Sequence, residues 1–240
     1  MNFLQLTFII KSKFLYKLGD NMFSEMIEKD AKTIVLEQTA FLKVLFGKLR
    51  DENTNIEQFR FAADRIIYLL LQRGFDFIPV NPKMVHTATG FDVDACEFSQ
   101  DFCSVAILRS GEAMEKSLLD LWKTTILGKI LVQRDEETLE PKFFFSKIPK
   151  DISKRHVFLL DPMLATGGSA GMAIKLLKEQ GVLEEKIIFV TLISCPEGIN
   201  RLRREYPNIN IITACIDEGL NDKGYIVPGL GDFGDRYFGV

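Results

Sequence analysis

The order of apolar and polar positions along the chain predicts two helices followed by alternating strands and helices. Apolar side chains recur at helical spacing in residues 31–50 and again in residues 56–73, with a polar spacer between them. This pattern predicts two helices in a hairpin-like arrangement. Two short β-prone segments, 83–87 and 91–98, come next and are separated by a turn at Gly90.

From Cys103 onward, strongly apolar runs alternate with amphipathic segments. Strands are predicted at 103–108, 128–133, 156–161, 186–194 and 209–216. A turn followed by a helix is predicted at 109–122, and further helices at 169–181 and 197–205. Residues 141–148 alternate enough to pair with the second of these strands as a hairpin. Such alternation is typical of an α/β fold with a mostly parallel sheet flanked by helices. Ligands of these sheets bind at the carboxyl ends of the strands.

Length and composition favour one globular domain. The 240 residues are 47% hydrophobic and 26% charged, and no repeat or Pro/Gly/Ser linker divides them. Residues 31–240 are therefore expected to form a single domain, with residues 1–30 as an N-terminal extension outside the core. A net charge of −3 gives no basic excess, so nucleic acid is not an expected partner. The apolar run at residues 3–10 is too short to span a bilayer, and no membrane association is expected.

The four cysteines point to a reducing compartment. None forms a CxxC pair, and three of them stand in apolar runs. The thiols are therefore expected to be reduced and buried, which favours the cytoplasm.

The strongest chemical signal is VFLLDPMLATGGSAGMAIKLL, residues 157–177. An apolar strand ends at Asp161, a loop with two glycines follows, and an amphipathic helix begins near Ser169. Glycines let the main chain turn tightly and approach a ligand, and the amides that open a helix favour a phosphate. Asp161 can accept hydrogen bonds from two adjacent hydroxyls, such as those of a ribose diol.

The same residues allow a simpler interpretation, in which residues 166–169 only cap the helix. The acid at the strand end weakens it, because a carboxylate near a phosphate makes sense chiefly with a sugar between them. No Gly-Lys-Ser/Thr follows, and the glycine spacing is not Gly-x-Gly-x-x-Gly. A nucleotide-hydrolysing or dinucleotide-binding loop is therefore disfavoured, and a phosphorylated ribose fits better.

Four segments resemble the uracil phosphoribosyltransferase family, in the family's order. DPMLATGGS (161–169) resembles its loop for phosphoribosyl pyrophosphate (PRPP), and ILRSGEAM (107–114) its pyrophosphate-side loop. VQRDEETLEPKFFFSKIP (132–149) resembles its arginine segment and protruding β-arm, and NDKGYIVPGLGDFGDRYFG (221–239) is similar to its uracil-binding hood. The resemblance covers about residues 34–240 and is closest to the eukaryotic and protist branch. It implies the type I phosphoribosyltransferase fold with N-terminal helices, a β-arm at about 131–150 and a hood at about 216–240.

The resemblance also implies a reaction and its residues: uracil and PRPP give UMP and pyrophosphate, in pyrimidine salvage. The catalytic positions are Asp161, Arg134 and Asp232. The PRPP positions are Arg109, Arg134, Asp161, Pro162, Met163, Leu164, Ala165, Thr166, Gly167, Gly168, Ser169 and Asp232. The uracil positions are Ile226, Gly231, Asp232 and Phe233. Magnesium would be held mainly by PRPP, with Asp232 reaching it through water.

The resemblance extends to assembly and regulation. A cluster of three phenylalanines at 143–145 is typical of ordinary packing, but at the tip of the expected β-arm it suggests contact with a partner subunit, and hence a homodimer or a higher homo-oligomer. Arg65 matches a GTP-effector position of the family, whereas Ile56 stands where a lysine is expected. GTP activation and an ordinary helix-surface charge therefore both stay open for Arg65.

Several alternatives remain at this point. Arg109 and Arg134 could each be surface ion-pair partners, the second with the acids at 135–137. His86 and His156 lie outside every motif, so histidine-based acid–base or covalent catalysis is not expected. The chain could be a catalytically silent relative that senses PRPP or a nucleotide, or a transferase for another base. The complete GYIVPGLGDFGD hood favours an active enzyme for uracil.

Overall fold

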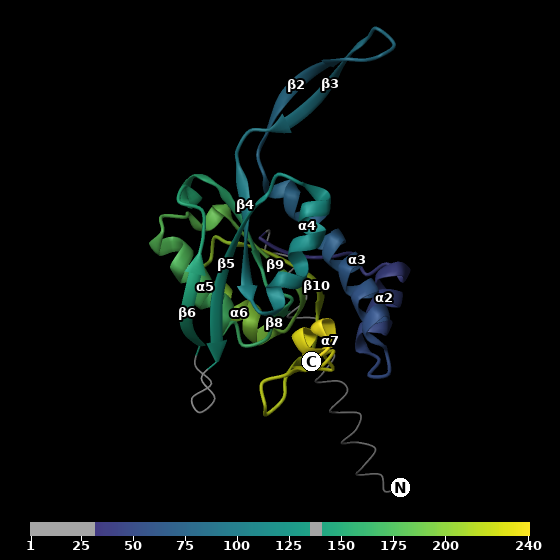
Figure 1. The fold of residues 1–240 in the computed structure, drawn as a ribbon, viewed down its shortest axis with the longest axis vertical. Helices are drawn as coiled ribbons and strands as arrows, with labels where there is room; N and C mark the ends of the chain where they lie inside the picture. The colour runs from purple at the N-terminus through teal and green to yellow at the C-terminus, as the bar shows by residue number, and fades with distance from the viewer. Residues whose placement is uncertain (1–31, 135–140) are drawn as a thin grey trace, which may run out of the picture.

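The computed structural model describes residues 32–134 and 141–240, and Figure 1 shows their arrangement. The predicted extension 1–30 and the acidic run 135–137 lie outside these residues. The strands are β1 Thr33–Val35, β2 Val80–His86, β3 Asp92–Phe98, β4 Phe102–Leu108, β5 Ile126–Arg134, β6 Pro141–Lys147, β7 His156–Leu160, β8 Met163–Leu164, β9 Ile187–Ser194, β10 Asn210–Ile216, β11 Gly219–Leu220 and β12 Ile226–Val227. The α-helices are α2 Ala40–Arg50, α3 Ile56–Gly74, α4 Glu115–Leu121, α5 Gly168–Glu179, α6 Pro196–Glu205 and α7 Phe233–Phe238. Short 3₁₀ turns are η1 Phe75–Phe77, η2 Ser110–Met114, η3 Ile152–Lys154 and η4 Glu184–Lys186.

A central sheet confirms the predicted α/β class. Its strand order is β1-β10-β9-β7-β4-β5-β6, and β8 pairs with β9 beside this path. Every pair in it is parallel except β5–β6, which is the predicted antiparallel hairpin. Parallel strands bring their carboxyl ends to one edge of the sheet, so the loops after β4, β7, β9 and β10 meet there.

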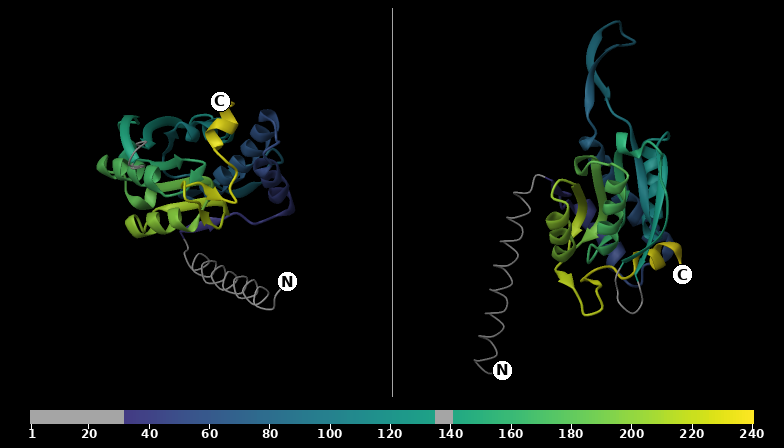
Figure 2. Two further views of the ribbon diagram at one scale, coloured as in Figure 1. Left: turned by 90° about the horizontal axis from the view of Figure 1, so that it is seen from below. Right: turned by 90° about the vertical axis from the view of Figure 1, so that its left-hand side faces the viewer.

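Each face of the sheet is covered by its own hydrophobic core, because successive side chains of a strand point to opposite faces. On β7, Val157 and Leu159 belong to the core under α5 and α6. Phe158 and Leu160 belong to the core under α2, α3 and α4. Figure 2 shows the sheet between these two helical layers.

The start of the first predicted helix is wrong. Residues 33–35 form β1, which pairs in parallel with β10 through Thr33 and Ile211. The helix begins only at Ala40, because the side chain of Thr39 accepts a hydrogen bond of 3.2 Å from the Leu42 amide and caps it. The prediction of two helices in a hairpin-like arrangement, here α2 and α3, is otherwise confirmed.

The protruding arm is made of other residues than expected. Figure 1 shows that the β2–β3 hairpin leaves the body of the molecule, and its residues are exposed along almost its whole length. The expected arm at about 131–150 is instead built on β5 and β6, which form one edge of the central sheet. The reason is burial: Ile130 and Val132 of β5 lie in the core under α5, whereas β2 and β3 have no such face.

The arm and the C-terminal segment lie at opposite ends of the molecule. The arm leaves from the amino end of β4, whereas β11, β12 and α7 lie at the carboxyl edge of the sheet (Figure 1). Within residues 32–134 and 141–240, no helix combines the length and the apolar character needed to cross a bilayer.

Candidate functional site

The loop between β7 and α5 is held in place by the neighbouring strand β9. The amide of Asp161 donates to the carbonyl of Val190 (3.2 Å), and β8 continues the parallel pairing with β9. Gly167 then takes a left-handed conformation, with φ +74°. A side chain is strained in that conformation, so glycine suits this position. Asp161 is thus placed at the carboxyl edge, directly before a turn that opens α5.

The N-terminus of α5 has no side-chain hydrogen bond at its cap residue, Gly167. The hydroxyl of Thr166 is 3.4 Å from the Gly168 amide, a long contact for a hydrogen bond. The amides of Ser169 and Ala170 donate to no main-chain carbonyl among the residues described. A helix start of this kind is a ready binding site for an anion. The first amides of every helix lack such partners, so this geometry fits both a phosphate site and the simpler interpretation, in which residues 166–169 only cap α5.

Two glycines far from the turn in sequence allow other segments to pack against it. A Cβ on Gly198 of α6 would lie 2.5 Å from the carbonyl oxygen of Ala165. A Cβ on Gly111 of η2 would lie 2.2 Å from the carbonyl oxygen of Leu160. The loop after β4 therefore lies against the end of β7, next to Asp161. The sequence motifs include Gly111 but gave it no role, and Gly198 carried no signal at all.

Arg109 comes directly after β4 and reaches towards the C-terminal helix. Its guanidinium forms an ion pair with Asp235 of α7, and both side chains are about half exposed. In the same place, a Cβ on Gly234 would lie 2.8 Å from the Ser110 hydroxyl. The hood thus packs on the loop 109–111, which in turn packs on the end of β7. This chain of contacts brings three of the four predicted motifs together.

The second predicted arginine is only partly described. Arg134 is the last residue of β5 and lies opposite Pro141 of β6 in the antiparallel pair. Its backbone is therefore at the carboxyl edge of the sheet, as a residue that contacts PRPP would be. Its side chain, and the acids 135–137 that could pair with it, lie outside what the structure describes.

Of the four predicted uracil positions, Ile226 and Phe233 have buried side chains, whereas Gly231 and Asp232 are exposed. The ring of Phe233 is 1% exposed and lies between Phe59 and Tyr237, with ring centroids at 5.6 and 5.5 Å. Ile226 is also buried. Gly231 has φ +80°, and Asp232 caps α7 by accepting a hydrogen bond of 2.9 Å from the Asp235 amide. Only the main chain of Phe233 can therefore face a ligand.

The main chain of the hood keeps donors available for a small planar ligand. The amides of Gly231 and Asp232 donate to no main-chain carbonyl in the described part of the chain. These amides have a hydrogen-bonding requirement that water or a ligand must meet. A base with carbonyl oxygens would suit them.

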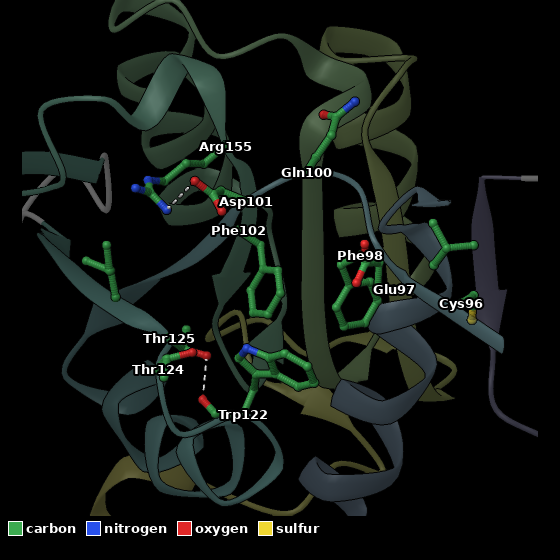
Figure 3. Close-up of a pocket in the computed structure, with 12 residues that line it drawn as sticks. Cys96, Glu97, Phe98, Gln100, Asp101, Phe102, Trp122, Thr124, Thr125 and Arg155 are labelled. Atoms are coloured by element: carbon green, nitrogen blue, oxygen red, sulfur yellow. Dashed lines mark hydrogen bonds and ion pairs between the residues drawn. The ribbon is translucent and has the colours of Figure 1, made fainter. Parts of the chain in front are cut away.

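A prominent cavity lies elsewhere. A cavity of about 500 Å³ lies at the base of the β2–β3 arm. Figure 3 shows the rings of Phe98, Phe102 and Trp122 in its wall. Asp101 and Arg155, 3.6 Å apart, line its rim. None of the predicted site residues whose side chains are described lines it, so the cavity and the carboxyl-edge site are two different places.

Of the cysteines and histidines described, Cys195 and Cys215 have thiols with raised pKa values, and both histidines lie away from the carboxyl edge. Burial raises the pKa of the Cys195 thiol to about 12 and that of Cys215 to about 11. Burial lowers the pKa of His156 at the start of β7. His86 pairs with Asp92 on the arm (2.9 Å). These positions agree with the expectation that histidine takes no part in the chemistry.

Comparison with known proteins decides the family. A sequence profile described as uracil phosphoribosyltransferase matches residues 35–240, which include the glycine turn, the loop after β4 and the hood. The chain belongs to the uracil phosphoribosyltransferase family. Uracil phosphoribosyltransferase 1 of Schizosaccharomyces pombe is 47% identical over 215 residues, which are 90% of this chain and 98% of that protein.

Solved structures agree with this family on the fold. The AQ2163 protein from Aquifex aeolicus is 31% identical, with a TM-score of 0.77 over 87% of this chain and 98% of that chain. Adenine phosphoribosyltransferase from Trypanosoma brucei, solved with AMP, pyrophosphate and ribose-5-phosphate, is 13% identical. Its TM-score is 0.53, over 86% of this chain and 90% of that chain. The predicted phosphoribosyltransferase fold is confirmed.

Proposed function

We propose that the chain transfers the phosphoribosyl group of PRPP to uracil, giving UMP and pyrophosphate. The observation that carries this proposal is the turn after Asp161, where a strand-end carboxylate precedes a helix N-terminus without a side-chain cap. Such a turn suits a ligand with a diol at one end and a phosphate at the other. A phosphoribosyl group has both.

The reaction is a displacement at the anomeric carbon. The bond to the pyrophosphate oxygen breaks and its electron pair leaves with pyrophosphate. The bond to uracil N1 forms, and the N1 proton passes to water or to the departing pyrophosphate. In this proposal the amides at the start of α5 hold the 5-phosphate, and Asp161 holds the ribose hydroxyls while positive charge develops on the sugar. Charge stabilisation and alignment can supply most of the acceleration at such a site without a strong base.

Arginine suits the leaving pyrophosphate because its planar fork binds phosphate oxygens in pairs. Arg109 and Arg134 are the proposed contacts, together with residues 162–169 of the turn. Because Arg109 pairs with Asp235, PRPP would replace that exposed ion pair. Exposed pairs of this kind contribute only about 0–1 kcal/mol, so the exchange costs little.

Magnesium fits this site as an ion carried by the substrate. In the parts of the chain that the structure describes, no group of three His, Cys, Asp or Glu side chains could hold a metal ion. Asp232 Oδ1 accepts from the Asp235 amide, which leaves Oδ2 for a water of the magnesium shell. When bound, the ion would neutralise charge on the leaving pyrophosphate.

Selection of uracil would rest on the main chain of the hood, at residues 226 and 231–233. An amide directed at uracil O4 accepts uracil, whereas the amino group of cytosine would face another donor. A site built on such hydrogen bonds can reject the wrong base by about 10⁴-fold or more.

Assembly, compartment and regulation complete the proposal. The arm carries exposed apolar side chains, Met84 (62%) and Phe91 (70%), which suit a contact with a second copy in a homodimer. Phe143, Phe144 and Phe145 of edge strand β6 are about half exposed and suit a similar contact. The described cysteines are free, which suits the cytoplasm. Arg65 lies on α3 with its guanidinium over the ring of Phe61, and a GTP site there stays a prediction.

A silent sensor of PRPP and a transferase for another base are the competing functions. Incubation of the purified protein with PRPP, magnesium and labelled bases separates all three. We expect UMP and pyrophosphate from uracil and at least about 10⁴-fold slower turnover of cytosine. PRPP binding without turnover of any base would indicate the sensor, and preferred turnover of another base would contradict the assignment of the hood.

A further inference from the structure

Arg50, the last residue of α2, holds the segment that leads into the hood. Its Nη1 and Nη2 donate to the two carboxylate oxygens of Asp217, at 2.7 and 2.6 Å. The same Nη1 donates to the carbonyl of Gly229 at 2.8 Å. One planar guanidinium thus joins α2 to two points of the chain after β10.

Asp217 makes this contact rigid. Its side chain is 3% exposed, its amide donates to the Ser194 carbonyl, and its Oδ2 accepts from the Gly229 amide at 2.8 Å. Burial disfavours the charged form, but the hydrogen bonds from Arg50 and Gly229 outweigh it and keep the pKa of Asp217 below its ordinary value. Both the amide and the carbonyl of Gly229 are therefore fixed by one ion pair.

The conformation and the close packing of Gly229 leave no room for a side chain. Its φ is +65°, and a Cβ would lie 2.0 Å from the carbonyl oxygen of Ile226. The turn from Ile226 to Gly229 therefore accepts only glycine at its end, and the Arg50–Asp217 ion pair fixes the position of that glycine.

Arg236 makes the reciprocal connection, from α7 back to the end of α2. It donates to the carbonyl of Leu230 (2.7 Å) and to that of Asp51 (2.6 Å), and it also contacts the carbonyl of Leu49. Its guanidinium lies over the ring of Phe59, 4.5 Å from the centroid. Burial lowers the pKa of Arg236, because removal from water disfavours its charged form.

Together the two arginines fix consecutive residues of the hood from both sides. Gly229 is held by Arg50 and Asp217, and Leu230 by Arg236, directly before Gly231 and Asp232. None of the hydrogen bonds of either arginine goes to residues 161–169 within the described chain. The arginines therefore bear on the base side of the site and not on the phosphate side.

We propose that Arg50 and Arg236 are positioning residues that hold residues 229–231 in the shape that binds the base. Neither residue touches substrate; each acts through the main chain of the hood. The inference rests on the proposed function. It adds that the end of α2, through its contacts with the hood, sets the affinity for uracil.

The test compares steady-state constants of Arg50→Lys and Arg236→Lys with those of the natural chain. Lysine keeps the positive charge but cannot span two carboxylate oxygens or three carbonyls in one plane. We expect the KM for uracil to rise about tenfold in each variant, the effect of one well-placed hydrogen bond to a charged group. The KM for PRPP should stay within about twofold of its natural value, since the turn after Asp161 keeps all its contacts.

A matched control is Arg73→Lys, since Arg73 is an exposed arginine in the last turn of α3 that pairs with the exposed Asp76 nearby. It should leave both constants unchanged. Thermal unfolding of all variants identifies any that do not fold. Arg50→Lys and Arg236→Lys are two separate tests, so one folded variant is enough to decide the question. An equal rise of both KM values, or an unchanged KM for uracil in folded variants, would overturn the inference. A natural chain that makes no UMP would contradict the proposed function itself, which is a different result.

Discussion

At the scale of single residues, the proposed site contains a carboxylate whose position is set by two strands. Asp161 follows β7, and its amide is bonded to Val190 of β9. Asp161 therefore stands at the carboxyl edge of the sheet. Asparagine has almost the same shape as aspartate, so it can replace the half-buried Asp161 without leaving a cavity.

Asp161→Asn tests the role of that charge. We expect the variant to fold and its kcat to fall about 100-fold, because one preorganised interaction with a developing charge is worth about 3 kcal/mol. The measurement is UMP formation with both substrates saturating. Asp120→Asn, an exposed acid on α4, serves as the control and should keep full activity. Full activity of Asp161→Asn would contradict the role of Asp161.

Residues whose role depends on neighbours in sequence could be predicted, and residues whose role depends on distant contacts could not. Asp161 and Gly167 stand within one strand–turn–helix segment, so their chemistry is visible in the printed order. Arg50 and Asp217 are 167 positions apart, and nothing local announces that they meet. Phe233 shows a further limit, because the sequence suggested its position in the uracil site but not that its ring is buried.

At the scale of elements, α6 is the helix that packs against the turn after Asp161. Gly198 allows the helix to approach the carbonyls of Leu164 and Ala165 at a distance that leaves no room for a methyl group. The backbone of both segments is involved, so neither can move as a flexible side chain would. The turn and the helix therefore form one rigid unit.

Gly198→Ala should push α6 away from the turn after Asp161. The added Cβ would sit 2.5 Å from the Ala165 oxygen, so α6 and the turn must shift. We expect a loss of about 1–3 kcal/mol in the free energy of unfolding, as for other overpacked positions, and a raised KM for PRPP. Denaturant unfolding and steady-state kinetics measure the two effects.

The control is another helical glycine with open space around it. A methyl group added at Gly47 of α2 would have no neighbour within 4 Å, so Gly47→Ala should stabilise the protein by about 0.5–1 kcal/mol. A Gly198→Ala variant as stable as Gly47→Ala would show that the contact with the turn is not close.

The elements also show why one part of the fold was predicted and another was not. Apolar runs such as β7 and β9 are buried on both faces, so the sequence alone identifies them as central strands. β1 is only three residues long and owes its form to pairing with β10, so its residues look like the start of a helix. The arm was misplaced because exposure, which separates β2–β3 from β5–β6, is a property of the whole fold.

At the scale of the whole molecule, the two ends of the sheet carry different parts of the chain. The carboxyl edge gathers the turn after Asp161, the loop 109–111 and the hood, whereas the arm and its aromatic cavity lie at the other end (Figures 1 and 3). Because the central strands run parallel, the functional loops that follow them reach the same edge.

The most direct test of the account is a crystal structure of the full chain soaked with PRPP and magnesium. We predict that the 5-phosphate lies within hydrogen-bonding distance, about 2.7–3.2 Å, of the amides at residues 167–170, and that Asp161 accepts from the ribose hydroxyls. A turn that stays without ligand, or PRPP bound only in the cavity at the base of the arm, would contradict the account.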